Sequence, residues 1–116
     1  AGFEVFISCT YRSKEEQDKV YAQGRTAPGK VVTQARGGQS PHNCTEGQKP
    51  AARAFDVAVR YMGSNNLLWD AQSPVWRRLV AIGEGLGLEN GGRMLKKNGK
   101  PLGDWPHFQL KGWKDL

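Results

Sequence analysis

Apolar residues recur along the chain at two spacings, and these spacings predict where strands and helices form. Phe3–Thr10 is dense in aromatic and β-branched residues, which is typical of a buried strand. Ala54–Tyr61 alternates between apolar and polar residues, so we expect a strand whose apolar side chains share one face. Those side chains are Phe55, Val57 and Val59.

A first helix is predicted after the first strand. Ser13 and Glu16 have the spacing of a capping box, and Gly24 provides a stop. The expected core contacts of this helix are Val20 and Tyr21. The basic, glycine-rich segment Gly24–Ser40 follows, and we interpret it as a long ordered loop beside a functional site, in which Lys30–Thr33 can form a short strand.

A second helix is predicted in the second half of the chain. Ser73 is an N-cap residue and Pro74 suits the first helical position, so the helix should begin there and end in the Gly83–Gly87 region. Its expected core residues are Val75, Trp76, Leu79, Val80 and Ile82. Lys97–Lys100 has the composition of a hairpin turn, and His107–Leu110 indicates a last short strand.

The order of these elements decides the fold class. Strands and helices do not alternate regularly enough for a parallel sheet with crossover helices. We therefore expect an α+β fold, with a small antiparallel sheet and helices packed on one side of it. Residues 1–116 show no change of composition that would mark a second domain, so we predict a single domain.

Composition and charge restrict the partners. The net charge of +6 favours anionic partners, but the lysines and arginines are scattered rather than gathered on one element, so we expect no nucleic acid. No apolar run approaches the roughly 20 residues of a membrane span. No signal peptide opens the chain, and we expect a monomer.

The candidate chemistry lies in the two histidines and one aspartate. His42 and His107 each stand next to a proline, which restricts the backbone, and Asp56 lies within an apolar run, where an unpaired carboxylate is costly. Two imidazoles and a carboxylate are ligands that a catalytic zinc ion takes from protein, with one position left for water. We predict a zinc site on the sheet formed by His42, Asp56 and His107.

Two further residues have predicted catalytic roles. Asp104 lies three residues before His107 and could act as the general base that activates water. Arg12, between the first strand and the helix cap, could stabilise an oxyanion or bind a substrate carboxylate. A turn-forming aspartate and a solvated arginine are the ordinary alternatives.

The cysteines leave several alternatives open. Cys44 follows His42 by two positions and could bind zinc, although a small core residue is the more common role of a cysteine. A disulfide between Cys9 and Cys44 is compatible with the sequence.

Several segments, in order along the chain, carry a resemblance to a known family. They are Arg12-Ser13 with Gln17, Tyr21–Thr26 with Pro28-Gly29, Gly37–Asn43, Ala54–Asp56, Gly87–Gly92 and Asp104–Phe108. Together they resemble the M15 family of zinc peptidases, which includes D-alanyl-D-alanine carboxypeptidases and L-alanyl-D-glutamate endopeptidases of the bacterial cell wall. The third and fourth segments are similar to the two ends of the family motif Ser-x-His-x-x-Gly-x-Ala-x-Asp, and the last is similar to its acid-x-x-His box.

The resemblance implies a function for the predicted site. It implies a fold like that of D-Ala-D-Ala carboxypeptidases and hedgehog proteins, zinc as the cofactor and Asp104 as the base. It further implies Arg12 at the substrate or transition state, and Ser40 and Gln34 as substrate contacts. The substrate would be the peptide stem of peptidoglycan, cut between L-alanine and D-glutamate, as in phage endolysins that pass from the host cytoplasm to the wall.

The sequence departs from the family pattern in two places, one between the predicted metal ligands and one in a motif on the substrate side. Asp56 follows His42 by 14 positions instead of seven, because Cys44–Arg53 looks like an inserted loop, so Cys44 and Glu46 remain alternative ligands. Asn90 replaces the tryptophan of the Gly-Leu-x-Trp-Gly-Gly motif. The alternative functions are a D-alanyl-D-alanine carboxypeptidase, with Arg12, Arg25 or Arg36 as the carboxylate clamp, and a zinc-bearing module that binds the cell wall without cutting it.

Overall fold

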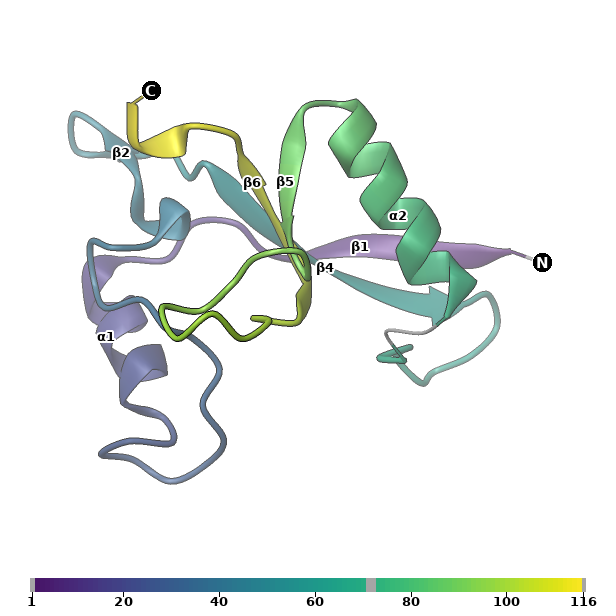
Figure 1. Cartoon of the computed structure of the whole chain (residues 1–116), viewed down its shortest axis with the longest axis horizontal. Coiled ribbons are helices and arrows are strands. Elements are labelled where there is room, and N and C mark those ends of the chain that lie inside the picture. Colours follow the sequence, from purple (N-terminus) through teal and green to yellow (C-terminus); the bar gives the residue numbers. More distant parts are fainter. Residues whose placement is uncertain (1, 71–72, 116) are drawn as a thin grey trace. The chain divides into compact units, whose positions relative to one another are not determined.

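The computed structural model describes residues 2–70 and 73–115 (Figure 1). Contacts between residues divide the chain into two compact units. The first unit contains the residues up to Cys9 and those from Phe55 onward, and the second unit contains Thr10–Ala54. No helix in the described part of the chain is both long and apolar enough to cross a membrane. The single domain remains a prediction.

The first unit is built on a four-stranded sheet. Its strands are β1 (Phe3–Cys9), β4 (Ala54–Tyr61), β5 (Leu88–Gly91) and β6 (Asp104–Leu110). They lie in the order β1-β4-β6-β5, and the outer pairs β1–β4 and β5–β6 are antiparallel. The predicted α+β class with a small antiparallel sheet is confirmed.

Helix α2 (Pro74–Gly85) packs on this sheet and closes the core. The helix begins as predicted, because the Ser73 side chain accepts a hydrogen bond from the Val75 amide and proline follows the cap. A Cβ added at Gly83 would lie 2.5 Å from the Phe108 ring, so the helix approaches β6 closely at this glycine. The buried core cluster consists of Val57, Val59, Trp76 and Phe108.

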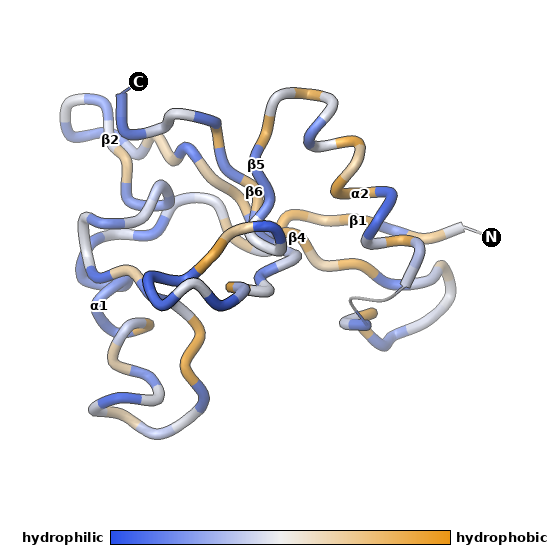
Figure 2. The backbone as a smooth tube through the Cα atoms, viewed as in Figure 1, coloured by the Kyte–Doolittle hydropathy of each residue, from blue (hydrophilic) through white to orange (hydrophobic). Residues whose placement is uncertain are grey.

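Two burial predictions for this unit are wrong. Ile82 is 55% exposed, because the core-facing stripe of α2 passes through Trp76 and Val80 instead. The first strand exists, and Figure 2 shows hydrophobic residues along it, but it is not buried. β1 is an edge strand, and its central residues Val5, Phe6 and Ile7 are 41–54% exposed. Strand composition reports a preference for extended backbone and does not report the strand's place in the sheet.

Of the three strands near the candidate site, two were predicted and one was not. β4 has the predicted bounds, whereas β6 begins at Asp104 rather than at His107. β5 was not predicted, since Leu88–Gly91 is short and contains asparagine and glycine, which strands disfavour. The predicted turn at Lys97–Lys100 is present and is flanked by the isolated bridge between Leu95 and Pro101.

The second unit begins with α1 (Lys14–Ala22), which has the predicted capping box and ends just before Gly24, a residue at φ 80°. Its buried residue is Gln17, whereas the predicted core residues Val20 and Tyr21 are only half-buried. No helix or named strand forms in Gly24–Ser40, as predicted for a long loop, and its place beside a functional site stays a prediction. The predicted strand at Lys30–Thr33 is absent from this described segment.

The rest of the second unit consists of short elements. The 3-10 helix η1 (Pro41–Asn43) is followed by β2 (Thr45–Glu46) and β3 (Lys49–Pro50), which pair as a small antiparallel hairpin. The segment that looked like an insertion therefore forms a two-stranded ribbon.

A last 3-10 helix, η2 (Trp113–Asp115), belongs to the first unit.

Candidate metal centre

Asp56 and His107 face each other across the neighbouring strands β4 and β6. The Oδ1 atom of Asp56 lies 3.1 Å from the Nδ1 atom of His107, and the histidine is 8% exposed. Val57 and Phe108, the next residues along the two strands, point into the core under α2. Because side chains alternate along a strand, Asp56 and His107 share the other face of the sheet.

The surroundings of His107 favour a cation at this position. Burial lowers the pKa of His107, but hydrogen bonds to Asp56 and Gln109 and the charges of Asp56 and Asp104 outweigh it, so the pKa lies above its ordinary value. When His107 is protonated, its Nδ1–H donates to Asp56 and its Nε2–H donates to Gln109, which satisfies both ring nitrogens in the metal-free protein. A metal ion held by Nδ1 and the Asp56 carboxylate oxygen would satisfy those two atoms equally, because zinc binds imidazole nitrogen and carboxylate oxygen.

The metal-free protein should therefore lose part of its stability as the pH rises. Since folding raises the pKa of His107, its stabilising contribution is fully present below the ordinary imidazole pKa and is lost as pH passes the raised value. Thermal unfolding of chelator-treated wild type and His107→Gln across pH would measure this contribution as the difference between their melting temperatures. We expect the difference to shrink with rising pH, and a constant or growing difference would contradict the assignment.

An irregularity in the pairing of β5 with β6 brings Asp104 and His107 together. Asn90 pairs with Phe108, but the next residue of β5, Gly91, pairs with Asp104, so three residues of β6 bulge between them. The buried Asn90 amide donates hydrogen bonds to two carbonyls of the bulge, those of Trp105 and His107, at 2.9 and 3.1 Å. The residue that replaces the motif tryptophan thus holds the backbone of a predicted metal ligand.

The glycine pair after Asn90 is explained by close packing. A Cβ at Gly91 would lie 2.5 Å from the Asp104 carbonyl oxygen and 3.1 Å from the Cβ of His107. A Cβ at Gly92 would lie 2.2 Å from the Trp105 ring. Only glycine allows β5 to approach the bulge this closely.

Gly91→Ala should therefore destabilise the protein by about 1–3 kcal/mol, because the added methyl group displaces the bulge. The control is Gly85→Ala at the end of α2, where an added Cβ meets nothing within 4 Å and alanine favours helix. Denaturant unfolding of both variants measures the difference. Equal stabilities would show that the bulge yields to the methyl group at no cost.

His42 lies in the second unit, on η1, where local hydrogen bonds fix it. The Ser40 hydroxyl accepts a hydrogen bond from the His42 amide, and the imidazole Nδ1 lies 2.6 Å from the Thr10 carbonyl oxygen. A carbonyl oxygen only accepts, so Nδ1 carries the proton and the lone pair is on Nε2. The predicted ligand is thus held in the tautomer that binds metal through Nε2.

Arg12 is anchored in the same unit as His42. Its amide donates to the His42 carbonyl at 2.9 Å, and its guanidinium donates to the Gln17 side-chain oxygen at 2.9 Å. Gln17 is fully buried and donates in turn to Thr33 and Ala35. Asn43 donates to the Arg12 carbonyl at 2.8 Å. Arg12 is therefore a positioned guanidinium rather than a solvated one.

Ser40 and Gln34, the two predicted substrate contacts, lie in different environments of the second unit. Ser40 is buried and caps the turn that carries His42, while Gln34 is exposed on the long loop. Arg25 and Arg36 both lie over the Tyr21 ring, and Arg25 also donates to two backbone carbonyls.

Asp56 and His107 belong to the first unit and His42 belongs to the second, and each offers an atom of a kind that binds zinc, so the three-residue centre stays a prediction. Cys44 and Glu46, the alternative ligands, also lie in the second unit. Glu46 lies in the β2–β3 hairpin, and both cysteines are present as thiols.

Several residues that orient the candidate site were not predicted as such. Gln17 and Asn43 hold Arg12, while Asn90 and Gln109 hold His107. Each is an amide side chain at a buried or half-buried position. Buried amides need hydrogen-bond partners, but the sequence does not reveal where those partners lie.

The chain was compared with known proteins. No family model matches it. It is 34% identical to the peptidoglycan L-alanyl-D-glutamate endopeptidase CwlK of Bacillus subtilis, in an alignment that covers 94% of this chain. This supports the resemblance to the M15 peptidase family. The chain spans 62% of the length of that relative.

Proposed function

We propose that this chain is a zinc-dependent peptidoglycan hydrolase that cuts the stem peptide between L-alanine and D-glutamate. The observation that carries the proposal is the opposed pair of Asp56 and His107, whose ligand atoms lie 3.1 Å apart on neighbouring strands. The similarity to an L-alanyl-D-glutamate endopeptidase along most of the chain supports this choice of substrate.

The proposed zinc ligands are His42, Asp56 and His107. Chain connectivity supports the addition of His42 to the pair, since the two units are joined at Cys9–Thr10 and at Ala54–Phe55. His42 bonds to Thr10 directly after the first junction, and Asp56, close to the second junction, pairs with Cys9. The donor set of two imidazole nitrogens and one carboxylate oxygen suits a catalytic zinc ion.

Asp104 is the proposed general base. Bound zinc would supply Lewis-acid chemistry to the scissile carbonyl and to water. The Asp104 carboxylate would take a proton from the attacking water and deliver it to the leaving amine. Its place at the start of β6 supports this role, because the bulge fixes Asp104 relative to His107.

Arg12 is proposed to stabilise negative charge on the substrate. Its guanidinium is held by Gln17, so little conformational entropy is lost when it binds an oxyanion or a carboxylate. Ser40 and Gln34 are proposed to contact the substrate. Ser40 also caps the turn that carries His42.

We also propose the finer features implied by the resemblance. These are a fold like that of D-Ala-D-Ala carboxypeptidases and hedgehog proteins, action as a monomer on the bacterial cell wall, and the role of a phage endolysin. The net charge of +6 supports attraction to an anionic wall.

Digestion of purified peptidoglycan tests the substrate. We expect new D-glutamate amino termini, because only cleavage after L-alanine releases that amine. Release of free D-alanine without new D-glutamate termini would instead indicate a carboxypeptidase. Arg25 and Arg36 both contact the Tyr21 ring. In a carboxypeptidase, Arg12 would therefore be the arginine that binds the substrate carboxylate. Zinc binding without any cleavage would indicate a wall-binding module.

A further inference from the structure

We infer that Gln109 and Glu89 are positioning residues that direct the Nδ1 lone pair of His107 toward Asp56. The inference concerns the ring of His107 itself, and its consequence for zinc rests on the proposed function. Two successive hydrogen bonds connect the three side chains: Glu89 on β5 contacts Gln109 on β6, and Gln109 contacts His107.

The first step is the orientation of the Gln109 amide. Its Nε2 atom donates to the Glu89 carboxylate oxygen at 3.2 Å. An ionised carboxylate only accepts hydrogen bonds, so the NH₂ group of Gln109 must face Glu89 and its Oε1 atom must face the other way. Glu89 and Gln109 are directly paired across β5 and β6, which holds the two side chains on one face of the sheet.

The second step is the tautomer of His107. The Oε1 atom of Gln109 lies 2.9 Å from the Nε2 atom of His107. Because Oε1 only accepts, it favours a proton on Nε2 and leaves the lone pair on Nδ1, the atom 3.1 Å from Asp56. Asp56 alone would favour the opposite tautomer, in which Nδ1–H donates to the carboxylate. Gln109 therefore offsets the effect of Asp56 on the neutral ring.

This balance decides which nitrogen can bind a cation beside Asp56. A ring with its proton on Nδ1 would have to move that proton before Nδ1 could bind metal, whereas the Nε2–H tautomer is ready. Outer hydrogen-bond partners of this kind fix ring orientation and tautomer at metal sites generally.

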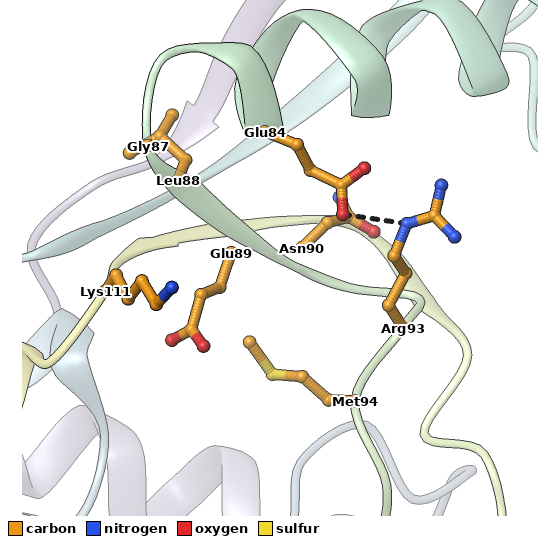
Figure 3. A pocket seen from close by; sticks show the side chains of 8 residues that line it. All are labelled: Glu84, Gly87, Leu88, Glu89, Asn90, Arg93, Met94 and Lys111. Carbon is orange, nitrogen blue, oxygen red and sulfur yellow. Dashed lines mark ion pairs between the residues drawn. The ribbon is translucent and has the colours of Figure 1, made fainter.

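Glu89 also lines a surface pocket, which supplies a matched control. The pocket is lined by Glu84, Gly87, Leu88, Glu89, Asn90, Arg93, Met94 and Lys111 (Figure 3). Glu84 shares this pocket with Glu89 but pairs with Arg93 at 2.8 Å. Glu84→Met and Glu89→Met therefore make the same change of charge in one pocket, and only Glu89→Met breaks the contact to Gln109.

Nitrogen NMR of the imidazoles tests the inference. The full chain, labelled with ¹⁵N-histidine and stripped of metal, has only two histidines, so a His42→Asn variant assigns the spectrum. At a pH where the rings are neutral, we expect Gln109→Met to shift His107 toward the Nδ1–H tautomer relative to wild type. Glu89→Met should give a smaller shift in the same direction, since it frees the amide to rotate, and Glu84→Met should give none.

Two further measurements complete the test. The double exchange Glu89→Gln with Gln109→Glu keeps a donor facing an acceptor between the two side chains and an acceptor facing Nε2, so it should retain the wild-type tautomer, which separates hydrogen bonding from packing. Chelator competition should show zinc bound about 10–100-fold more weakly by Gln109→Met than by wild type. An unchanged tautomer in both Gln109→Met and Glu89→Met would overturn the inference.

The outcome is separable from that of the proposed function. The tautomer is measured without metal or substrate, so it can change as expected even if the wild type neither binds zinc nor cuts peptidoglycan. Conversely, the wild type can bind zinc and cut peptidoglycan while neither Gln109→Met nor Glu89→Met changes the His107 tautomer. That result would support the proposed function and contradict the positioning role.

Discussion

Asp104→Asn is expected to reduce peptidoglycan hydrolysis by about 10²–10⁴-fold while zinc remains bound. Asparagine has nearly the shape of aspartate, so the bulge that pairs residue 104 with Gly91 should persist. The amide cannot take a proton from water at neutral pH, which removes the proposed base and leaves the metal ligands unchanged. Initial rates of wall digestion and zinc content, measured on the same preparation, check both parts.

The control for this variant is Asp115→Asn, which removes one exposed carboxylate from η2 in the same unit. Its rate should match that of wild type. If Asp104→Asn hydrolysed peptidoglycan at the wild-type rate, Asp104 would not be the base. If it lost zinc together with activity, its role would be structural or ligating.

Asp56→Ala should abolish zinc binding and hydrolysis together. Asp56 supplies the only carboxylate of the proposed ligand set, and its loss also removes the partner that faces His107 at 3.1 Å. The zinc dissociation constant should rise by more than the roughly 10–100-fold that loss of an outer partner costs. Chelator competition measures the affinity, and circular dichroism confirms that the variant is folded.

Asp115→Ala, the same substitution at an exposed site, should bind zinc as wild type does. Retention of full zinc affinity by Asp56→Ala would contradict the assignment. Cys44 and Glu46, the alternative ligands in the inserted segment, would then be the next candidates for the third ligand.

The parts of the fold that depend on local pattern were predictable. The β4 strand follows from the approximate alternation of apolar and polar residues at Ala54–Tyr61, and α2 follows from its Ser73-Pro74 cap. It was also predictable that Asp56 lies on the face of its strand opposite to Phe55, Val57 and Val59, because successive side chains of a strand point to opposite faces. Proximity of Asp56 to His107 was expected only because both were assigned to one metal site.

The remaining features depend on contacts between distant segments. β1 has the composition of a central strand but lies at the sheet edge, and strand order is not encoded in the strand itself. The bulge between Asp104 and Phe108 arises from pairing with β5, a strand too short to predict. The contacts of Gln109 and Asn90 follow from that pairing, so they could not be recognised before the register was known.

X-ray absorption spectroscopy of the zinc-loaded chain tests the central claim most directly. We predict one zinc ion per chain, bound only by nitrogen and oxygen at roughly 2.0–2.2 Å, with the scattering pattern of two imidazoles. A sulfur neighbour at roughly 2.3 Å, or a single imidazole, would contradict a centre formed by His42, Asp56 and His107.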